Sequence, residues 1–165
     1  MKKLLLSAAI AASLGMIPAV QAATTTNNFN VSVTLSSQCQ VTNNASQTVD
    51  FGTYTAFQAA PQASVSSAGL TFRCTRGFAP VSTAFDTVAA NSTAAGVGVL
   101  VGLQYALTAV AGATTPGTAA TSATIGTGDS HLYTVSGSML ADQAGTCGAA
   151  TCGPTIQVRQ LIVTF

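Results

Sequence analysis

Two stretches of the chain alternate apolar with polar or small residues, and this period of two predicts half-buried β-strands. The first stretch covers residues 29–35 and places its large apolar side chains at every second position: Phe29, Val31, Val33 and Leu35. The second covers residues 97–107, where valine, leucine and tyrosine alternate mostly with glycine, alanine and glutamine. Its glycines and β-branched residues favour one long strand over a membrane-spanning helix.

Shorter apolar runs between turn-forming residues predict further strands at four places: 49–51, 70–74, 81–85 and 133–139. The last strand is expected at residues 156–165. Its apolar positions change phase near Gln160, from Ile156 and Val158 to Leu161, Val163 and Phe165. That change indicates either a β-bulge or a strand that contacts two surfaces.

Glycine, proline, asparagine and serine separate these runs, and residues 109–128 form an Ala/Thr/Gly/Ser tract that contains Pro116. This composition predicts a long flexible loop. Many short strands joined by frequent turns predict an all-β protein, with an antiparallel β-sandwich as its architecture. At 165 residues the chain has the length of one domain.

The N-terminus carries the features of a secretory signal peptide. Lys2 and Lys3 precede an apolar run over residues 4–17, which is too short to span a membrane comfortably, and Ala22 ends a small-residue cleavage pattern. We expect a signal peptide at 1–22, cleaved after Ala22, and a single domain at 23–165. The alternative is an N-terminal membrane anchor, which the short run disfavours.

Removal of the signal peptide leaves a domain with very few charges. Its charged residues are Arg73, Arg76 and Arg159 against Asp50, Asp86, Asp129 and Asp142. Three positive and four negative charges give a net charge of −1, and scattered arginines cannot form the basic stripe that nucleic-acid binding needs. We therefore expect no nucleic-acid partner. A surface with so little charge suits a protein whose normal state is assembled.

The cysteines predict disulfide bonds. All four lie in the expected mature chain: Cys39, Cys74, Cys147 and Cys152. An even number of cysteines in an exported chain is typical of disulfides. Of the three possible pairings we favour Cys39 with Cys74 and Cys147 with Cys152, because the second loop is short and holds a glycine. A zinc site is the competing interpretation, but it normally uses two close pairs, and Cys39 and Cys74 are far apart in sequence.

An enzyme active site has little support in the residues. The single histidine, His131, follows Asp129 and Ser130, so three residue types of a catalytic triad stand side by side. Adjacent residues on a strand point to opposite faces and cannot readily form the proton relay. We expect a polar turn there before Tyr133, and no enzymatic activity, cofactor, metal site or small-molecule substrate.

A series of short motifs runs through the mature chain in a recognisable order. An alternating strand is followed by Cys39, by Asp-Phe-Gly at 50–52 and by Leu-Thr-Phe-Arg-Cys at 70–74. Leu-Gln-Tyr at 103–105 and a C-terminal strand that ends in Phe165 complete the series. This order resembles the spore coat protein U domain family, which includes subunits of archaic (Csu-type) chaperone–usher pili.

The resemblance implies an immunoglobulin-like antiparallel β-sandwich that lacks one strand, leaving an apolar groove and an unpaired sheet edge. It implies a structural subunit of a secreted surface fibre (pilus) or coat, exported through the periplasm. A periplasmic chaperone would lend a strand first, and at an outer-membrane usher the N-terminal strand of the next identical or related subunit would replace it. By this likeness the donor strand holds Phe29, Val31, Val33 and Leu35, and the chaperone-contact strand holds Leu161, Val163 and Phe165.

Two alternatives stay open at this point. Alternation alone does not distinguish a donor strand from the first strand of the domain's own core, so residues 29–35 can serve either purpose or both. The C-terminal strand can likewise belong to ordinary core packing. For function, the alternative is a carbohydrate- or surface-binding adhesin module, although the chain has no tryptophan for an aromatic binding platform.

Overall fold

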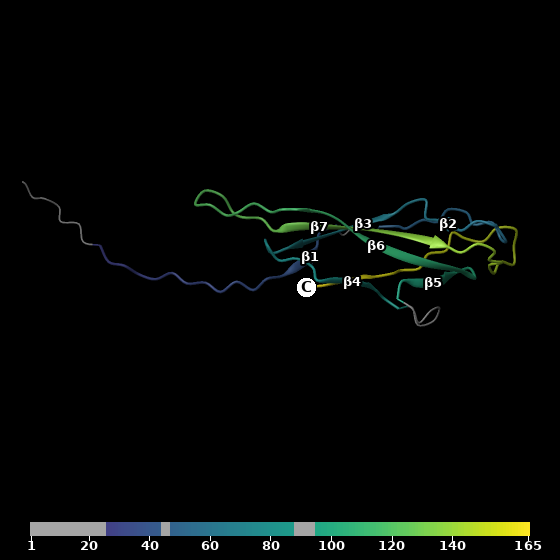
Figure 1. Ribbon diagram of the computed structural model, residues 1–165, viewed down its shortest axis with the longest axis horizontal. Coiled ribbons are helices and arrows are strands. Elements are labelled where there is room, and N and C mark those ends of the chain that lie inside the picture. The colour runs from purple at the N-terminus through teal and green to yellow at the C-terminus, as the bar shows by residue number, and fades with distance from the viewer. Residues whose placement is uncertain (1–25, 44–46, 88–94) are drawn as a thin grey trace, which may run out of the picture. The chain divides into compact units, whose positions relative to one another are not determined.

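The computed structural model of the protein describes residues 26–43, 47–87 and 95–165 (Figure 1). The chain divides into two units, Met1–Thr34 and Leu35–Phe165. The expected signal peptide, residues 1–22, lies outside the described residues. Within the described part of the chain there is no helix that is long and apolar enough to cross a membrane.

The second unit is built from antiparallel β-strands, and the prediction of an all-β, sandwich-like fold is confirmed. Its described residues hold eight strands: β1 (Cys39–Val41), β2 (Gln62–Ala63), β3 (Ala68–Cys74), β4 (Ser82–Phe85), β5 (Val97–Leu100), β6 (Leu103–Thr115), β7 (Asp129–Met139) and β8 (Leu161–Thr164). The large sheet has the order β1-β3-β7-β6-β5, and β2 also pairs with β7. β4 and β8 form a separate two-stranded sheet (Figure 1).

One face of the large sheet holds the core. Every second residue of β7 from His131 to Met139 is buried, because successive side chains of a strand point to opposite faces. Near the middle of the sheet, Phe72 and Tyr133 make an edge-to-face contact with ring centroids 5.8 Å apart. A further buried cluster is formed by Phe51, Leu103, Tyr105 and Met139.

The prediction of one long strand over residues 97–107 is wrong, because a tight turn at Val101 and Gly102 splits this stretch into β5 and β6. Leu100 pairs with Leu103, and the two turn residues have φ angles of 45° and 74°. This is a two-residue type I′ hairpin, which Asn-Gly usually marks. A Cβ at Gly102 would lie 2.3 Å from Thr146 Oγ1, so the close packing of Thr146 requires glycine there.

Two loop and strand assignments also differ from the sequence expectation. β6 continues to Thr115, so the first part of the tract 109–128 is strand rather than flexible loop. Residues 49–51 form no strand, although Phe51 is buried in the core. For β6, pairing with β7 outweighs the local Ala/Thr/Gly composition.

The remaining strands agree more closely. Those expected at 70–74 and 133–139 are confirmed within β3 and β7, and the one expected at 81–85 is confirmed, to within one residue, by β4. The C-terminal strand is shorter than expected. Of residues 156–165 only Leu161–Thr164 form a strand, and it pairs with β4.

Candidate functional site

The C-terminal segment keeps one alternating phase through Gln160. Gln157, Arg159, Leu161 and Val163 are all half-buried, whereas the residues between them are exposed. The inward positions are therefore polar before Gln160 and apolar after it. A β-bulge is the wrong interpretation of the phase change seen in the sequence. The segment instead contacts a polar surface first and an apolar surface second, which leaves Ile156 and Val158 outward.

Arg159 is the centre of the polar surface. Its Nε lies 3.0 Å from Asp86 Oδ1, and its terminal nitrogens donate to the backbone carbonyls of Asp86 and Val97 at 2.9 and 3.1 Å. It also donates to the Tyr105 hydroxyl at 2.9 Å and lies over that ring, 5.7 Å from its centroid. The Tyr105 hydroxyl in turn donates to Gln157. These contacts tie the segment before β8 to the end of β4, to β5 and to β6, and so join the small sheet to the large one.

Burial disfavours the charged form of Arg159, but hydrogen bonds to Tyr105 and Asp86 outweigh it and raise the pKa of Arg159 above its usual value. The Arg159 side chain is only 9% exposed. Gly98 on β5 leaves room for this network, since a Cβ there would lie 2.3 Å from the Tyr105 hydroxyl oxygen. The expected strand pattern did not single out these residues. One feature of the sequence could have predicted them: Gln157 and Arg159 stand at alternate positions that lead to Leu161, so they share its inward face.

One edge of β8 has no partner strand among the described residues. The N–H of Asp86 donates to the Gln160 carbonyl at 3.1 Å, which sets the hydrogen-bonded register between β4 and β8. Antiparallel pairs alternate between bonded and non-bonded, so the backbone groups of Leu161 and Val163 point away from β4. Within the described residues no strand pairs with that second edge of β8. A row of backbone donors and acceptors is thus left available to another strand.

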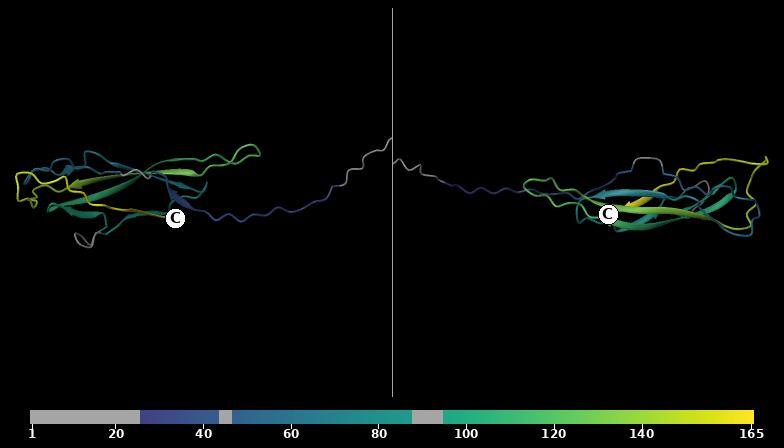
Figure 2. Two further views of the ribbon diagram at one scale, coloured as in Figure 1. Left: turned by 180° about the vertical axis from the view of Figure 1, so that it is seen from behind. Right: turned by 90° about the horizontal axis from the view of Figure 1, so that it is seen from above.

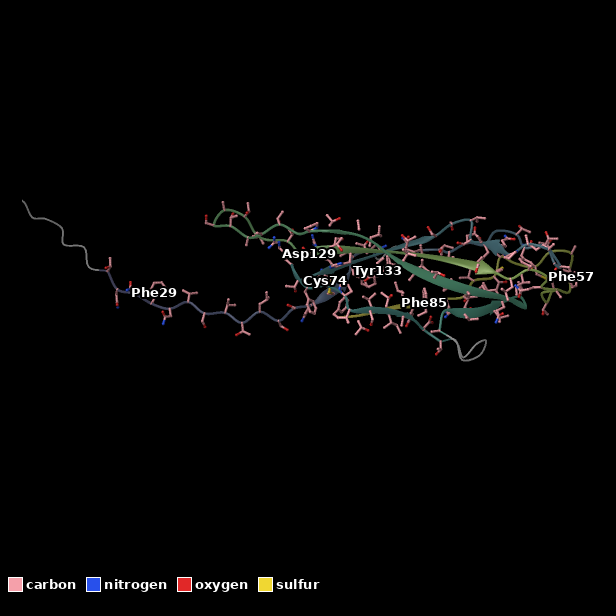
Figure 3. The ribbon with its side chains drawn as sticks, in the orientation of Figure 1. Phe29, Phe57, Cys74, Phe85, Asp129 and Tyr133 are labelled. Carbon is pink, nitrogen blue, oxygen red and sulfur yellow. A yellow bond between two sulfur atoms is a disulfide. The ribbon has the colours of Figure 1, made fainter. Side chains whose placement is uncertain are left out.

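The three predicted chaperone-contact residues lie together at this edge. Leu161 and Val163 are half-buried on the inner side of β8, and Phe165 follows directly. The Phe165 ring lies 6.2 Å from the Phe78 ring and remains 40% exposed. Phe85, which pairs with Leu161 across the small sheet, is half-buried and packs close to Gly96 (Figure 3). The small sheet therefore presents apolar side chains inward beside the edge of β8 that has no partner strand among the described residues.

The predicted donor residues take no part in either described sheet. Residues 26–38 contain no strand. Phe29, Val31 and Val33, which belong to the first unit, are 85%, 85% and 92% exposed. Leu35, at the start of the second unit, is 74% exposed. The structure thus contains an apolar segment with the pattern of a strand but without a sheet of its own.

Both disulfide bonds are present in the predicted pairing. Cys39 and Cys74 stand directly opposite each other on β1 and β3 and are bonded, so the bridge fixes the end of the large sheet. Cys147 and Cys152 close an exposed loop. Two disulfides suggest an oxidising, extracytoplasmic environment, since thiols stay reduced in the cytoplasm.

The Asp129-Ser130-His131 sequence begins β7 rather than forming the expected polar turn. The Asp129 carboxylate accepts the N–H groups of Gly117 and Gly77 at 2.6 and 2.8 Å, and these bonds lower its pKa. His131 is buried, with Nδ1 3.1 Å from Thr114 Oγ1, and its Nε2 has no hydrogen-bond partner in the described chain. The two side chains thus make separate contacts rather than a relay.

No family model, curated protein or solved structure matches the chain. The resemblance to the spore coat protein U domain family therefore stays a prediction. The candidate site combines a sheet edge that has no partner strand among the described residues with a separate apolar segment of strand-like pattern.

Proposed function

We propose that the protein is a structural subunit of a secreted surface fibre (pilus) or coat and that it polymerises by donor-strand exchange. One observation carries the proposal: the same chain holds an exposed alternating segment, residues 29–35, and a two-stranded sheet whose β8 edge has no partner strand among the described residues. A segment that can add as a strand and an edge that can accept one are the two requirements of β-strand addition.

The energetics favour insertion of the segment into a neighbour. Backbone groups of Leu161 and Val163 supply the hydrogen bonds, and the inward face of the small sheet supplies apolar contact. Burying Phe29, Val31, Val33 and Leu35 contributes roughly 2 kcal/mol for each side chain, about 8 kcal/mol in total before ordering costs. Because donor and acceptor belong to one chain, identical copies can bind head to tail into a homopolymer.

An open edge beside apolar side chains is an aggregation hazard in a free subunit. The proposal therefore includes a periplasmic chaperone that covers β8 through Leu161, Val163 and Phe165 until assembly, and an outer-membrane usher where subunits exchange it for the next donor strand. Export through the periplasm agrees with the two disulfides. The assembled product is a cell-surface or secreted fibre.

A self-complemented variant tests the proposal. A second copy of residues 26–38 is attached behind Phe165 through a flexible Gly/Ser linker, so that β8 receives a strand from its own chain. We expect a stable soluble monomer that forms no fibres, whereas the unmodified mature chain either polymerises or requires the chaperone. Size-exclusion chromatography and electron microscopy of both preparations provide the measurement.

The matched control carries Val31→Asp and Val33→Asp in the attached copy only. It should lose the stabilisation, because two charged side chains cannot occupy apolar pockets without partners. The proposal is wrong if the unmodified mature chain stays soluble, folded and monomeric for days without any partner. It is also wrong if the control fusion is as stable as the intact fusion.

A further inference from the structure

The strands β6 and β7 continue beyond the large sheet as a narrow hairpin, residues 116–128. Paired threonines hold its two arms together: Thr127 N–H donates to the Thr118 carbonyl at 2.9 Å, and Thr121 N–H donates to the Thr124 carbonyl at 2.9 Å. The hydroxyls of each pair also lie within hydrogen-bond distance, at 2.9 and 2.7 Å. Both views of Figure 2 show this hairpin projecting past the strands.

The base of the hairpin is clamped to the neighbouring turn. Asp129 accepts the N–H groups of Gly117 and Gly77, one from each segment. Arg76 donates through Nε to the Gly117 carbonyl at 3.1 Å. The clamp fixes the direction in which the hairpin leaves the sheet. A segment held at its base and along its length is suited to a defined contact rather than to a flexible linker.

The hairpin leaves the large sheet at the end where the chain enters it. Cys39, Cys74 and Asp129 pair in one row across β1, β3 and β7, and Cys74 and Asp129 lie together at the hairpin's base in Figure 3. Gln38 accepts a hydrogen bond from Thr75 just beyond this row. Residues 35–38, which belong to the second unit, therefore leave the sheet at the same end as the hairpin.

The lengths of residues 35–38 and of the hairpin arm determine what lies beside the hairpin in a fibre. An extended chain spans about 3.3 Å per residue, so Leu35 is about 10 Å from Gln38 at most. If Leu35 inserts into a neighbour, that neighbour begins within about 10 Å of this end of the sheet. The arm from Thr115 to Thr121 reaches about 20 Å beyond the same end by the same rise. The hairpin is longer than the gap that it must cross.

We infer that residues 116–128 form a second contact between successive subunits, against another copy of this chain. The inference rests on the proposed donor-strand polymerisation. The hairpin is free of charged residues and presents Ile125, which is 92% exposed, near its tip. An uncharged surface can be covered without burying an unpaired charge. The donor strand alone would leave subunits joined by a short linker, and the hairpin braces that joint.

Photo-crosslinking tests the contact directly. Ile125 is replaced by the photo-reactive residue p-benzoyl-phenylalanine in the full chain, and the control places it at Val110, which is 58% exposed on the outer face of β6 within the sheet. Irradiation of purified fibres should give a ladder of crosslinked subunits from position 125 and little from position 110. No ladder from position 125 in normal fibres, or equal ladders from both positions, would overturn the inference.

A shortened hairpin supplies an independent measurement. Residues 119–126 are replaced by Asn-Gly, which retains the Thr118–Thr127 pair and the Asp129 clamp. Fibres should still assemble with unchanged resistance to dissociation, while their persistence length in electron micrographs falls several-fold. An unchanged persistence length would overturn the inference that the hairpin stiffens the joint between subunits. Failure of the wild-type chain to form any fibre would instead overturn the proposed function and the brace with it.

Discussion

Residues 29–35 and 103–107 have the same alternating pattern and opposite environments. Leu103 and Tyr105 are 8% and 3% exposed, on the inner face of a strand paired on both sides. Val31 and Val33 are 85% and 92% exposed and belong to no strand. Alternation therefore records that a segment can form one face of a sheet. It does not record which chain supplies the rest of that sheet.

The comparison is most sharply tested by adding one charge to the buried face of the large sheet and one to residues 29–35. Val135→Asp on the inner face of β7 buries a carboxylate without a partner, at a cost on the order of 5 kcal/mol, which removes most of the stability of an ordinary domain. We expect this variant to lose both chaperone binding and fibres. Val33→Asp should abolish fibres while chaperone binding is retained, because the subunit's own core is untouched.

Ser32→Asp is the matched control for Val33→Asp, since it adds the same charge in the opposite phase of the segment. Its fibre yield should stay near that of the wild type. Chaperone pull-down and fibre yield, measured together on all three variants, separate the two regions. Intact fibres from Val33→Asp would contradict a donor role, and loss of chaperone binding would place Val33 in the domain's own core.

The next largest effect concerns the bridge where the unpaired segment meets the sheet. The loop closed by Cys39 and Cys74 is much longer than that closed by Cys147 and Cys152. Loop-entropy arguments assign about 4 kcal/mol to the first and about 2 kcal/mol to the second. Urea unfolding of the self-complemented domain, with each pair changed to alanine, measures both. Equal losses, or a larger loss from the short loop, would show that chain entropy does not govern these bridges.

Arg159 tests a third alternating stretch, in which the inward positions change from polar to apolar. Arg159→Met leaves the partly buried Asp86 carboxylate without its partner, and we expect a loss of about 3 kcal/mol in urea unfolding. Adding Asp86→Asn to that variant should recover part of the loss, because no charge then remains unpaired. Wild-type stability in Arg159→Met would mean that the network does not join the two sheets energetically.

The smallest effect is a pH dependence of stability, which arises from Asp129 at the base of the hairpin of residues 116–128. Hydrogen bonds from Gly117 and Gly77 hold the pKa of Asp129 below its ordinary value of 3.8. The carboxylate therefore stabilises the folded chain above pH 3.8, and this contribution is lost as the pH falls through the lowered folded-state pKa. Asp129→Asn should melt below the wild type at neutral pH.

Melting curves of Asp129→Asn and the wild type at a series of pH values check this prediction. The difference between them should shrink as the pH falls below 3.8. Asp142→Asn, which changes an exposed aspartate outside the clamp, is the control for the substitution itself and should melt close to the wild type at neutral pH. If the difference in melting temperature is the same at every pH, the ionised Asp129 carboxylate does not stabilise the clamp.

Local sequence was sufficient for some features of this protein. The all-β class followed from the period of two and the frequent turns, and the strands around Phe72 and Tyr133 lay where the apolar runs placed them. The disulfide pairing also followed from spacing, because one loop was short and the other cysteines remained as its complement. The strand patterns and the short Cys147–Cys152 loop each lie within a few neighbouring residues, which the sequence displays directly.

Other features depended on contacts between distant segments. The hairpin at Val101 and Gly102 lies within unbroken apolar alternation, so only the pairing of Leu100 with Leu103 reveals it. The structural role of Arg159 depends on Asp86, Val97 and Tyr105, which come from other segments and contact its guanidinium group. Side-chain periodicity indicates which face of a strand a residue occupies. Its burial and its hydrogen-bonding partners depend on which other segments of the chain pack against that face. For this reason the sequence by itself determined the strand-forming capacity of residues 29–35, and the tertiary structure alone left both that segment and the edge of β8 without a partner strand among the described residues.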